Sequence, residues 1–192
     1  MNSTEKKSVL FISCGIFKDE LEYLLREKKL DGEVVFLDAA LHVNFDRLKE
    51  KLVGALQEHR GRTDDLKVVY GYCHPEMQEI MENYQAKKIR AGNCLEAMLG
   101  KEELQRLSSG PKTFFLSAGW INHWEEMFRQ GKEDFDFDFE AMFDSYQRIV
   151  VLDTGIIPLD EEKLRKFSEF TRLPVERKAI TLDYFMKLVQ SI

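Results

Sequence analysis

Short apolar runs alternate along the chain with segments whose apolar residues recur every three or four positions. The runs are rich in β-branched and aromatic residues and are bounded by glycine or polar residues, which is typical of β-strands. Because they are almost continuously apolar, we expect strands that are covered on both faces, as in a parallel sheet. The predicted strands span residues 8–13, 33–37, 66–72, 87–90, 113–117 and 148–152.

The intervening segments have the spacing of amphipathic helices. Phe17, Leu21 and Leu24 fall at i, i+4 and i+7, and similar stripes run through residues 45–56 and 182–189. Side chains that can accept a hydrogen bond from the first turn of a helix stand before three such segments. These predicted N-caps are Asn44, Asp160 and Thr181.

The alternation of strands and helices predicts an α/β protein with right-handed crossovers. We expect a Rossmann-like, open, mostly parallel sheet of about six strands with helices on both faces. The length of 192 residues, with 44% hydrophobic and 11% aromatic residues, fits one domain that buries a sizeable core. Residues 155–192 are expected to form a C-terminal helical segment packed on this domain, and the aromatic content allows a homodimer interface.

Charge and hydropathy exclude several classes of protein. The chain has 28 Lys and Arg against 34 Asp and Glu, a net charge of −6, which argues against a nucleic-acid-binding surface because phosphates require clustered cations. No apolar run approaches the roughly 20 residues that span a bilayer. The first apolar stretch is also too short for a secretory signal. We therefore expect a cytoplasmic protein with no nucleic-acid or membrane partner.

The chain has three cysteines, Cys14, Cys73 and Cys94. An odd number in a chain without an export signal argues against a disulfide framework. Three interpretations stay open at this point: buried spectators, a nucleophile, or metal ligands.

The positions of the cysteines favour metal ligands. Cys14 ends the first predicted strand, Cys73 follows the third, and Cys94 follows the fourth, while His42 lies just past the second. Because the carboxyl ends of parallel strands share one edge of a sheet, where ligands bind, these four side chains should converge. Three thiolates and an imidazole suit zinc, and three thiolates alone suit an iron–sulfur cluster with one open position.

Local structure is expected to influence the state of these thiols. Helices predicted directly after the cysteines would favour thiolate over thiol through the helix dipole. The alternative is that all three are core residues, because free cysteines are usually buried and no compact C-x-x-C spacing is present. His74, next to Cys73, and His123, after the fifth strand, are weaker candidates for a ligand or a proton-transfer group.

Glycines at strand ends offer a second use of the same edge. Gly15, Gly71 and Gly119, with Trp120, could let the backbone approach a bound small molecule closely, with the thiols as spectators. The chain contains no G-x-G-x-x-G motif, P-loop or G-x-S-x-G elbow. Dinucleotide binding, nucleoside-triphosphate binding and a hydrolase triad are therefore not supported.

Residues 131–146 combine acidic and aromatic side chains. Phe135, Phe137 and Phe139 alternate with acidic residues, whereas Phe139 and Phe143 also fit a helix. We expect a loop that enters an amphipathic helix whose acidic residues face water. The alternative is an acidic face, within 135–146, that docks a partner protein.

With these residues identified, the chain resembles the DUF 1638 family, found largely in methanogens and other anaerobes. The resemblance covers roughly residues 8 to 157 as an ordered set of short motifs. These are Cys14-Gly15-Ile16, Glu20-Leu21, Leu37-Asp38, Leu41-His42, Tyr70-Gly71, Cys73, Arg90-Ala91, Cys94, Leu99-Gly100, Thr113, Gly119-Trp120 and Asp153-Thr154-Gly155.

The resemblance implies a cytoplasmic α/β protein, often encoded near corrinoid-dependent methyltransferase systems. The recurrent cysteine and histidine positions of the family fall on Cys14, Cys73, Cys94 and His42. It therefore implies a metal-binding protein, with zinc favoured over an iron–sulfur cluster, in anaerobic one-carbon or methyl-transfer metabolism.

A corrinoid protein or a methyltransferase is the implied partner, and whether the protein is an enzyme is left open. Two alternatives are kept. The first is a module that binds a corrinoid, a folate or a related molecule without metal, and the second is an interaction protein that docks through residues 135–146.

Overall fold

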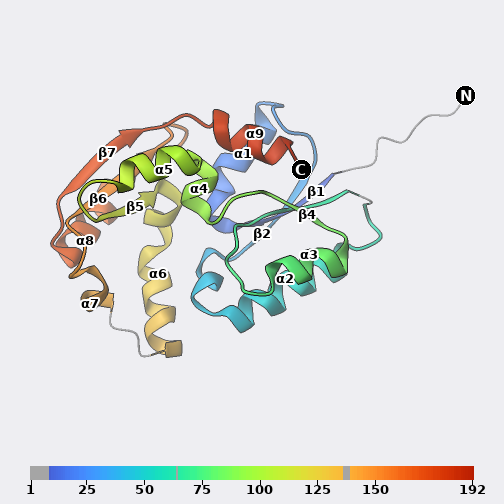
Figure 1. Ribbon diagram of the computed structural model, residues 1–192, viewed down its shortest axis with the longest axis horizontal. Helices are drawn as coiled ribbons and strands as arrows, with labels where there is room; N and C mark the ends of the chain where they lie inside the picture. Colours follow the sequence, from blue (N-terminus) through green and yellow to red (C-terminus); the bar gives the residue numbers. More distant parts are fainter. Residues whose placement is uncertain (1–8, 64, 136–138) are drawn as a thin grey trace, which may run out of the picture.

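The computed structural model describes residues 9–63, 65–135 and 139–192, and within them two parallel sheets are surrounded by helices (Figure 1). The first sheet has the order β2-β1-β3-β4, and the second has the order β5-β6-β7. The strands are β1 (Leu10–Cys14), β2 (Glu33–Leu37), β3 (Leu66–Val69), β4 (Lys87–Lys88), β5 (Thr113–Ser117), β6 (Arg148–Asp153) and β7 (Val175–Ala179). The predicted α/β class with parallel strands is confirmed, but the strands form two smaller sheets instead of one sheet of about six.

Strand β7 was not expected from the sequence, which predicted only helical structure after residue 155. Its sequence, VERKA, has three charged residues among five, and three of its positions are exposed. β7 lies at the edge of the second sheet and pairs only with β6 in the described chain. An edge strand is partly solvated, so it lacks the continuous apolar pattern that marks the buried strands.

The helices are η1 (Gly15–Phe17), α1 (Lys18–Arg26), η2 (Ala39–Val43), α2 (Phe45–His59), α3 (Met77–Tyr84), α4 (Cys94–Leu99), α5 (Lys101–Ser108), α6 (Ala118–Phe135), α7 (Phe139–Phe143), α8 (Glu161–Thr171) and α9 (Asp183–Gln190). None of the described helices combines the length and the apolar character needed to cross a membrane. The acidic and aromatic segment 135–146 falls partly on residues 136–138, which lie outside the described residues.

Two of the three predicted N-caps are confirmed. Asn44 accepts a hydrogen bond from the backbone N–H of Arg47 at 3.0 Å. Asp160 accepts from the N–H groups of the second and third residues of α8 at 3.1 and 3.0 Å. The prediction for Thr181 is wrong, because α9 begins at Asp183 after Leu182, and the Thr181 hydroxyl donates instead to the Asp183 carboxylate at 3.1 Å.

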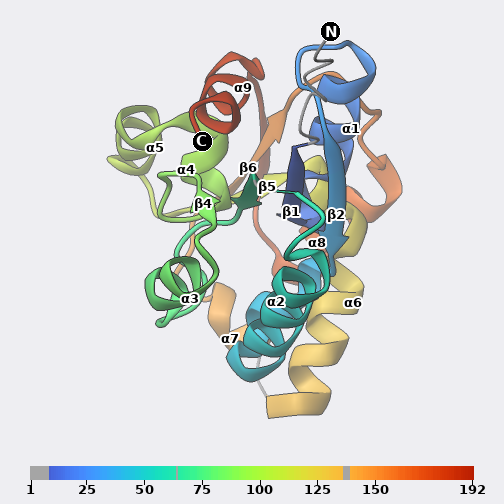
Figure 2. The same ribbon diagram turned by 90° about the vertical axis from the view of Figure 1, so that its right-hand side faces the viewer.

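The first sheet is covered on both faces, as its apolar strands predict. Leu10 and Ile12 pack with the apolar stripes of α2 and α3, whereas Phe11, between them, packs with those of α1 and α9. This alternation is the two-residue period of a strand. Figure 2 shows α2 and α3 on one side of the sheet and α1 and α9 on the other.

The second sheet packs against an aromatic cluster. The rings of Phe114, Trp124 and Phe167 lie within it, with ring centroids 5.2 Å apart for Trp124 and Phe167 and 5.9 Å apart for Phe114 and Phe167. Helices α6, α7 and α8 supply most of the remaining side chains. Aromatic pairs at these separations add stability beyond the area they bury.

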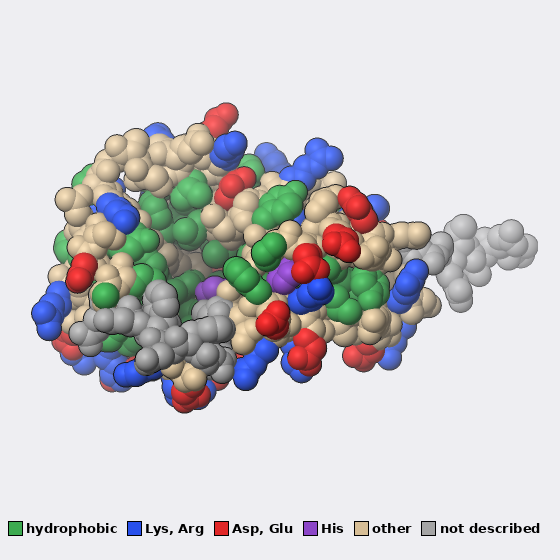
Figure 3. Space-filling model, turned by 60° about the horizontal axis from the view of Figure 1, so that its bottom comes forward, with side chains coloured by type: hydrophobic (Ala, Val, Ile, Leu, Met, Phe, Trp, Pro, Cys, Tyr) green, Lys and Arg blue, Asp and Glu red, His purple; other side chains and the backbone are tan. Residues whose placement is uncertain are grey.

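The carboxyl ends of the two sheets meet. Gly119, in the first turn of α6 after β5, lies against η1, so that a Cβ there would be 2.4 Å from the carbonyl oxygen of Ile16. Helix α6 also packs against η2, which follows β2. Figure 3 shows a hollow with hydrophobic side chains along it between the half that contains the second sheet and the half with α2 and α3. The loops after β1, β2 and β5 are therefore neighbours, although they belong to different sheets.

Candidate functional site

The three cysteines lie at the carboxyl edge of the first sheet, as predicted. Cys14 is the last residue of β1, and Cys94 is the first residue of α4. Cys73 follows β3 after the loop residues 70–72, because β3 ends at Val69, earlier than predicted. All three are free thiols of intermediate exposure.

A close backbone approach brings the loops of Cys73 and Cys94 together. A Cβ added at Gly71 would lie 2.7 Å from Asn93 Cα and 2.7 Å from the Gly92 carbonyl oxygen, so only glycine fits there without a shift. The N–H of Tyr72 donates to the same carbonyl of Gly92 at 2.9 Å. The residue before Cys73 is thus bonded directly to the segment that leads into Cys94.

The thiols are close enough to influence one another electrostatically. Burial raises the pKa of Cys14 to about 12, and the charges of Cys94 and Cys73 raise it further. Burial likewise raises the pKa of Cys94 to about 11, with Cys73 adding to the shift. The three side chains therefore form one electrostatically coupled group, which we call the thiol cluster (Cys14, Cys73 and Cys94).

The thiolate form that helix dipoles were expected to favour is opposed by burial. Burial also raises the pKa of Cys73, so all three groups are thiols at neutral pH in this structure. Nearby backbone N–H groups lower the pKa of each cysteine, but their effect is smaller than that of burial. The helices are also short or displaced, since η1 has three residues and α3 begins only at Met77.

Two residues that the sequence did not single out for a functional role border the thiol cluster. The Tyr70 side chain is buried, and its hydroxyl interacts with the Cys14 side chain. Burial, followed by the charge of Cys14, raises the pKa of Tyr70 well above its ordinary value, which places the hydroxyl near that thiol. Only the fold reveals this proximity, because an aromatic residue at a strand end usually indicates packing.

Lys88 is the second neighbour. Its ammonium lies 3.7 Å from the centre of the Tyr72 ring and donates to the carbonyl of Ile89 at 2.8 Å. Burial lowers the pKa of Lys88, while the charge of Cys73 acts in the opposite direction. The charge of Lys88 in turn lowers the pKa of Cys73 against the larger effect of burial. Lys88 is thus a positive charge that lies close to Cys73.

His42 lies on η2, past the end of β2, where its side chain is exposed. Its Nδ1 is 2.7 Å from the carbonyl oxygen of Ala39, a distance that makes Nδ1–H the donor and leaves Nε2 available as a ligand atom. Within the described part of the chain, no group of three or more Cys, His, Asp or Glu side chains stands in an arrangement that would hold a metal ion. In the described structure the thiol cluster and His42 are therefore not arranged as a metal site.

The structure gives the predicted small-molecule residues roles in packing. Gly15 and Gly119 sit against backbone carbonyls, like Gly71, so the fold itself requires glycine at these strand ends. Trp120 is partly buried, and its ring makes edge contacts with Phe114 and Phe128 at centroid distances of 5.4 and 5.7 Å. Ligand binding by these residues stays a prediction, because packing contacts neither require nor exclude it.

The two weaker histidine candidates have different settings. His74 is buried, its Nδ1 accepts from the N–H of Glu76 at 3.0 Å, and its ring makes an edge contact with Phe45. These contacts hold the His74 ring in the turn that precedes α3. His123 lies on α6, where it is exposed.

Comparison with protein-family models now adds to this geometry. The model described as "Protein of unknown function (DUF1638)" matches residues 36–189. The chain belongs to the DUF1638 family. The match covers Cys73, Cys94 and His42 and extends through the C-terminal segment, whereas Cys14 precedes it. Searches of curated proteins and of solved structures found no match.

Proposed function

We propose that this DUF1638 protein binds a soft metal ion through the thiolates of Cys14, Cys73 and Cys94. Zinc is the favoured metal, and an iron–sulfur cluster is the alternative. The observation that carries the proposal is the placement of three free thiols from separate elements at the carboxyl edge of one parallel sheet, near enough for their charges to raise one another's pKa. Three sulfur donors match the preference of zinc and iron–sulfur sites for thiolate.

The charge balance of the thiol cluster supports a cation. Three thiolates in a buried setting would repel one another, and Lys88 is the nearby positive charge that the structure records. A divalent metal would supply the missing charge. Because the ligands must be deprotonated, metal binding would release protons, and affinity would rise with pH.

Tyr70 supports the thiolate form of Cys14. Its buried hydroxyl lies beside this sulfur and interacts with it. A thiolate would accept the hydroxyl proton as a hydrogen bond, as partners of metal ligands commonly do.

His42 is the proposed fourth ligand for zinc. The bond from Nδ1 to the carbonyl of Ala39 fixes the tautomer in which Nε2 carries the lone pair, and this arrangement is common for histidine ligands. A closed site with four protein ligands would be structural. With His42 away from the metal, the open position would allow the metal to act as a Lewis acid or to hold an activated thiolate.

The cellular role that we propose is cytoplasmic and belongs to anaerobic one-carbon or corrinoid-dependent methyl-transfer metabolism. It rests on what the resemblance to DUF1638 proteins stated above implies. The proposed partner is a corrinoid protein or a methyltransferase. Co-elution of the purified chain with a corrinoid protein on size exclusion would test this part independently of the metal.

The decisive experiment is metal analysis of protein prepared without air. We expect about one zinc, or several irons, per chain, and we expect Cys73→Ser to lose the metal while its circular dichroism is retained. Iron–sulfur clusters would add a broad visible absorbance that zinc does not give. Protein that contains neither metal and takes up neither on reconstitution would refute the proposal.

Zinc titration by calorimetry in buffers of different ionisation enthalpy measures the protons released. We expect two to three per zinc at pH 7, because the pKa values of Cys14 and Cys94 are raised to about 12 and about 11. His42→Ala should weaken binding at least tenfold if the imidazole is a ligand, whereas His59→Ala, a matched change on α2, should not. Release of fewer than one proton would mean that the thiols are not the ligands.

A further inference from the structure

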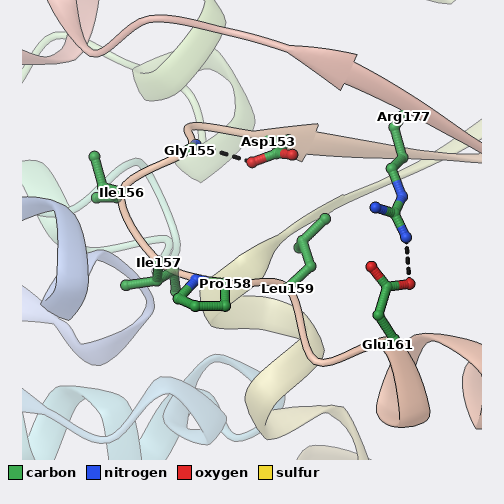
Figure 4. Close-up of a pocket in the computed structure, with 8 residues that line it drawn as sticks. All are labelled: Asp153, Gly155, Ile156, Ile157, Pro158, Leu159, Glu161 and Arg177. Atoms are coloured by element: carbon green, nitrogen blue, oxygen red, sulfur yellow. Dashed lines mark hydrogen bonds and ion pairs between the residues drawn. The ribbon is translucent and has the colours of Figure 1, made fainter.

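A pocket of about 430 Å³ lies beyond the carboxyl end of β6, on the second sheet (Figure 4). It is bordered by the loop of residues 154–160 and by the start of α8. Its volume falls in the range of roughly 300–1,000 Å³ typical of small-molecule sites. Ligands of parallel α/β sheets bind outside the carboxyl ends of the strands, which is where this pocket lies. No residue of the thiol cluster lines it.

The lining of this pocket, which we call the β6 pocket, is apolar on one side and charged on the other. The loop supplies four apolar side chains from the stretch 156–159. The charged residues come from three elements: Asp153 from β6, Glu161 from α8 and Arg177 from β7. Figure 4 shows Asp153 and Arg177 on neighbouring strands and Arg177 turned toward Glu161.

The charges in the β6 pocket do not balance. Arg177 and Glu161 form an ion pair and neutralise each other. The Asp153 carboxylate accepts the N–H of Gly155 at 2.9 Å, and no cation pairs with it among the described residues. The negative charge of Asp153 is therefore left without a cationic partner in the described structure beside the apolar side chains of residues 156–159. A ligand ammonium would pair with this carboxylate through a charge-assisted hydrogen bond.

The loop holds its shape without filling the pocket. The bond from Gly155 to Asp153 fixes its start, where Gly155 has φ +67°, and Asp160 fixes its end as the N-cap of α8. A Cβ at Gly155 would meet nothing within 4 Å, so its surroundings are open. The neighbouring Thr154 carries a buried hydroxyl that has no partner in the described chain. A loop anchored at both ends around an open interior suits a small-molecule site.

We propose that the β6 pocket binds a small primary amine with an apolar body. The ammonium contacts Asp153, and the body lies on the apolar stretch 156–159. This site is separate from the proposed metal site, so Cys73→Ser leaves amine binding unchanged.

The test is a nuclear magnetic resonance titration of the ¹⁵N-labelled full chain with phenethylamine, and with phenylacetate as a probe of matched shape and opposite charge. Phenethylamine is expected to shift the amides of Gly155, Ile156 and Ile157 in a saturable manner. Phenylacetate is expected to cause no saturable shift. Preference for phenylacetate, or absence of saturation by both probes, overturns the proposal.

Variants test whether the charge of Asp153, and not only the shape of the pocket, determines the affinity. Asp153→Asn removes the charge but keeps an oxygen that can accept from Gly155, and it should weaken phenethylamine binding at least tenfold. Glu50→Gln, an exposed change on α2, should have no effect. Arg177→Gln frees the Glu161 carboxylate on the surface and should tighten binding about threefold, which tests the charge even if Asp153→Asn fails to fold. Weaker binding in Arg177→Gln, or unchanged binding in folded Asp153→Asn, overturns the proposal.

Discussion

Glu20 is a fully buried carboxyl group on the apolar stripe of α1, between Phe17 and Leu24. Neither of its oxygens has a hydrogen-bond partner among the described residues. Burial raises the pKa of Glu20 from 4.5 to about 7, with a smaller contribution from the charge of Asp19. The folded state therefore binds this proton more tightly than the unfolded chain does.

The consequence is a loss of stability as pH rises. Between pH 4.5 and 7 the folded state holds a proton that the unfolded state has released, so the free energy of unfolding falls through this window and levels off above it. Linkage over this shift gives a loss of about 2 to 3 kcal/mol between pH 5 and pH 8. Glu20→Gln removes the titrating group but keeps its shape, and it should be free of this loss.

Urea denaturation at pH 5 and pH 8 measures the effect. We expect the difference in free energy of unfolding between Glu20→Gln and the wild type to be about 2 to 3 kcal/mol more favourable to the variant at pH 8 than at pH 5. Comparison with the wild type cancels the titration of all other groups. Glu22→Gln, an exposed change on the same helix, should show no pH-dependent difference. A gap between Glu20→Gln and wild type that is the same at both pH values would refute the assigned pKa.

Three further changes test the fold around the sites. Gly71→Ala would place a Cβ 2.7 Å from the backbone of residues 92–93, so it should lower the free energy of unfolding by about 1–3 kcal/mol and weaken zinc binding. Gly110→Ala adds a Cβ in open space and should change neither quantity. Thermal melts and zinc titrations of both variants make the comparison. Asp160→Ala removes the N-cap of α8 and should lower the free energy of unfolding in urea by about 1 kcal/mol. Phe167→Ala removes the buried centre of the aromatic cluster and should cost about 3–5 kcal/mol by the same assay, and a cost below 1 kcal/mol would contradict that packing.

The local pattern of apolar residues predicted the buried strands correctly. The positions of β1, β2, β5 and β6 followed from short apolar runs, and the placement of Cys14, Cys73 and Cys94 at strand ends followed from those strands. The caps at Asn44 and Asp160 followed as well, because an N-cap depends on residues within one turn.

The sequence did not predict the features that depend on burial or on pairing between distant residues. Strand β7 is polar because it lies at an edge, and no local signal shows that the strands divide between two sheets. The protonation state of the cysteines was likewise not predictable from the sequence. Helices next to the cysteines favoured thiolates, but burial, which depends on the fold, raises the pKa of each cysteine.

The sequence alone determined an α/β class, parallel strands and three cysteines at strand ends, because the two-residue and 3.6-residue periods are properties of neighbouring residues. Tertiary structure decided which strands pair and brought Tyr70 and Lys88 to the thiol cluster. It also formed the β6 pocket from Asp153, Glu161 and Arg177. These features join residues far apart in the chain, and their energies depend on burial and charge, which exist only once the chain has folded.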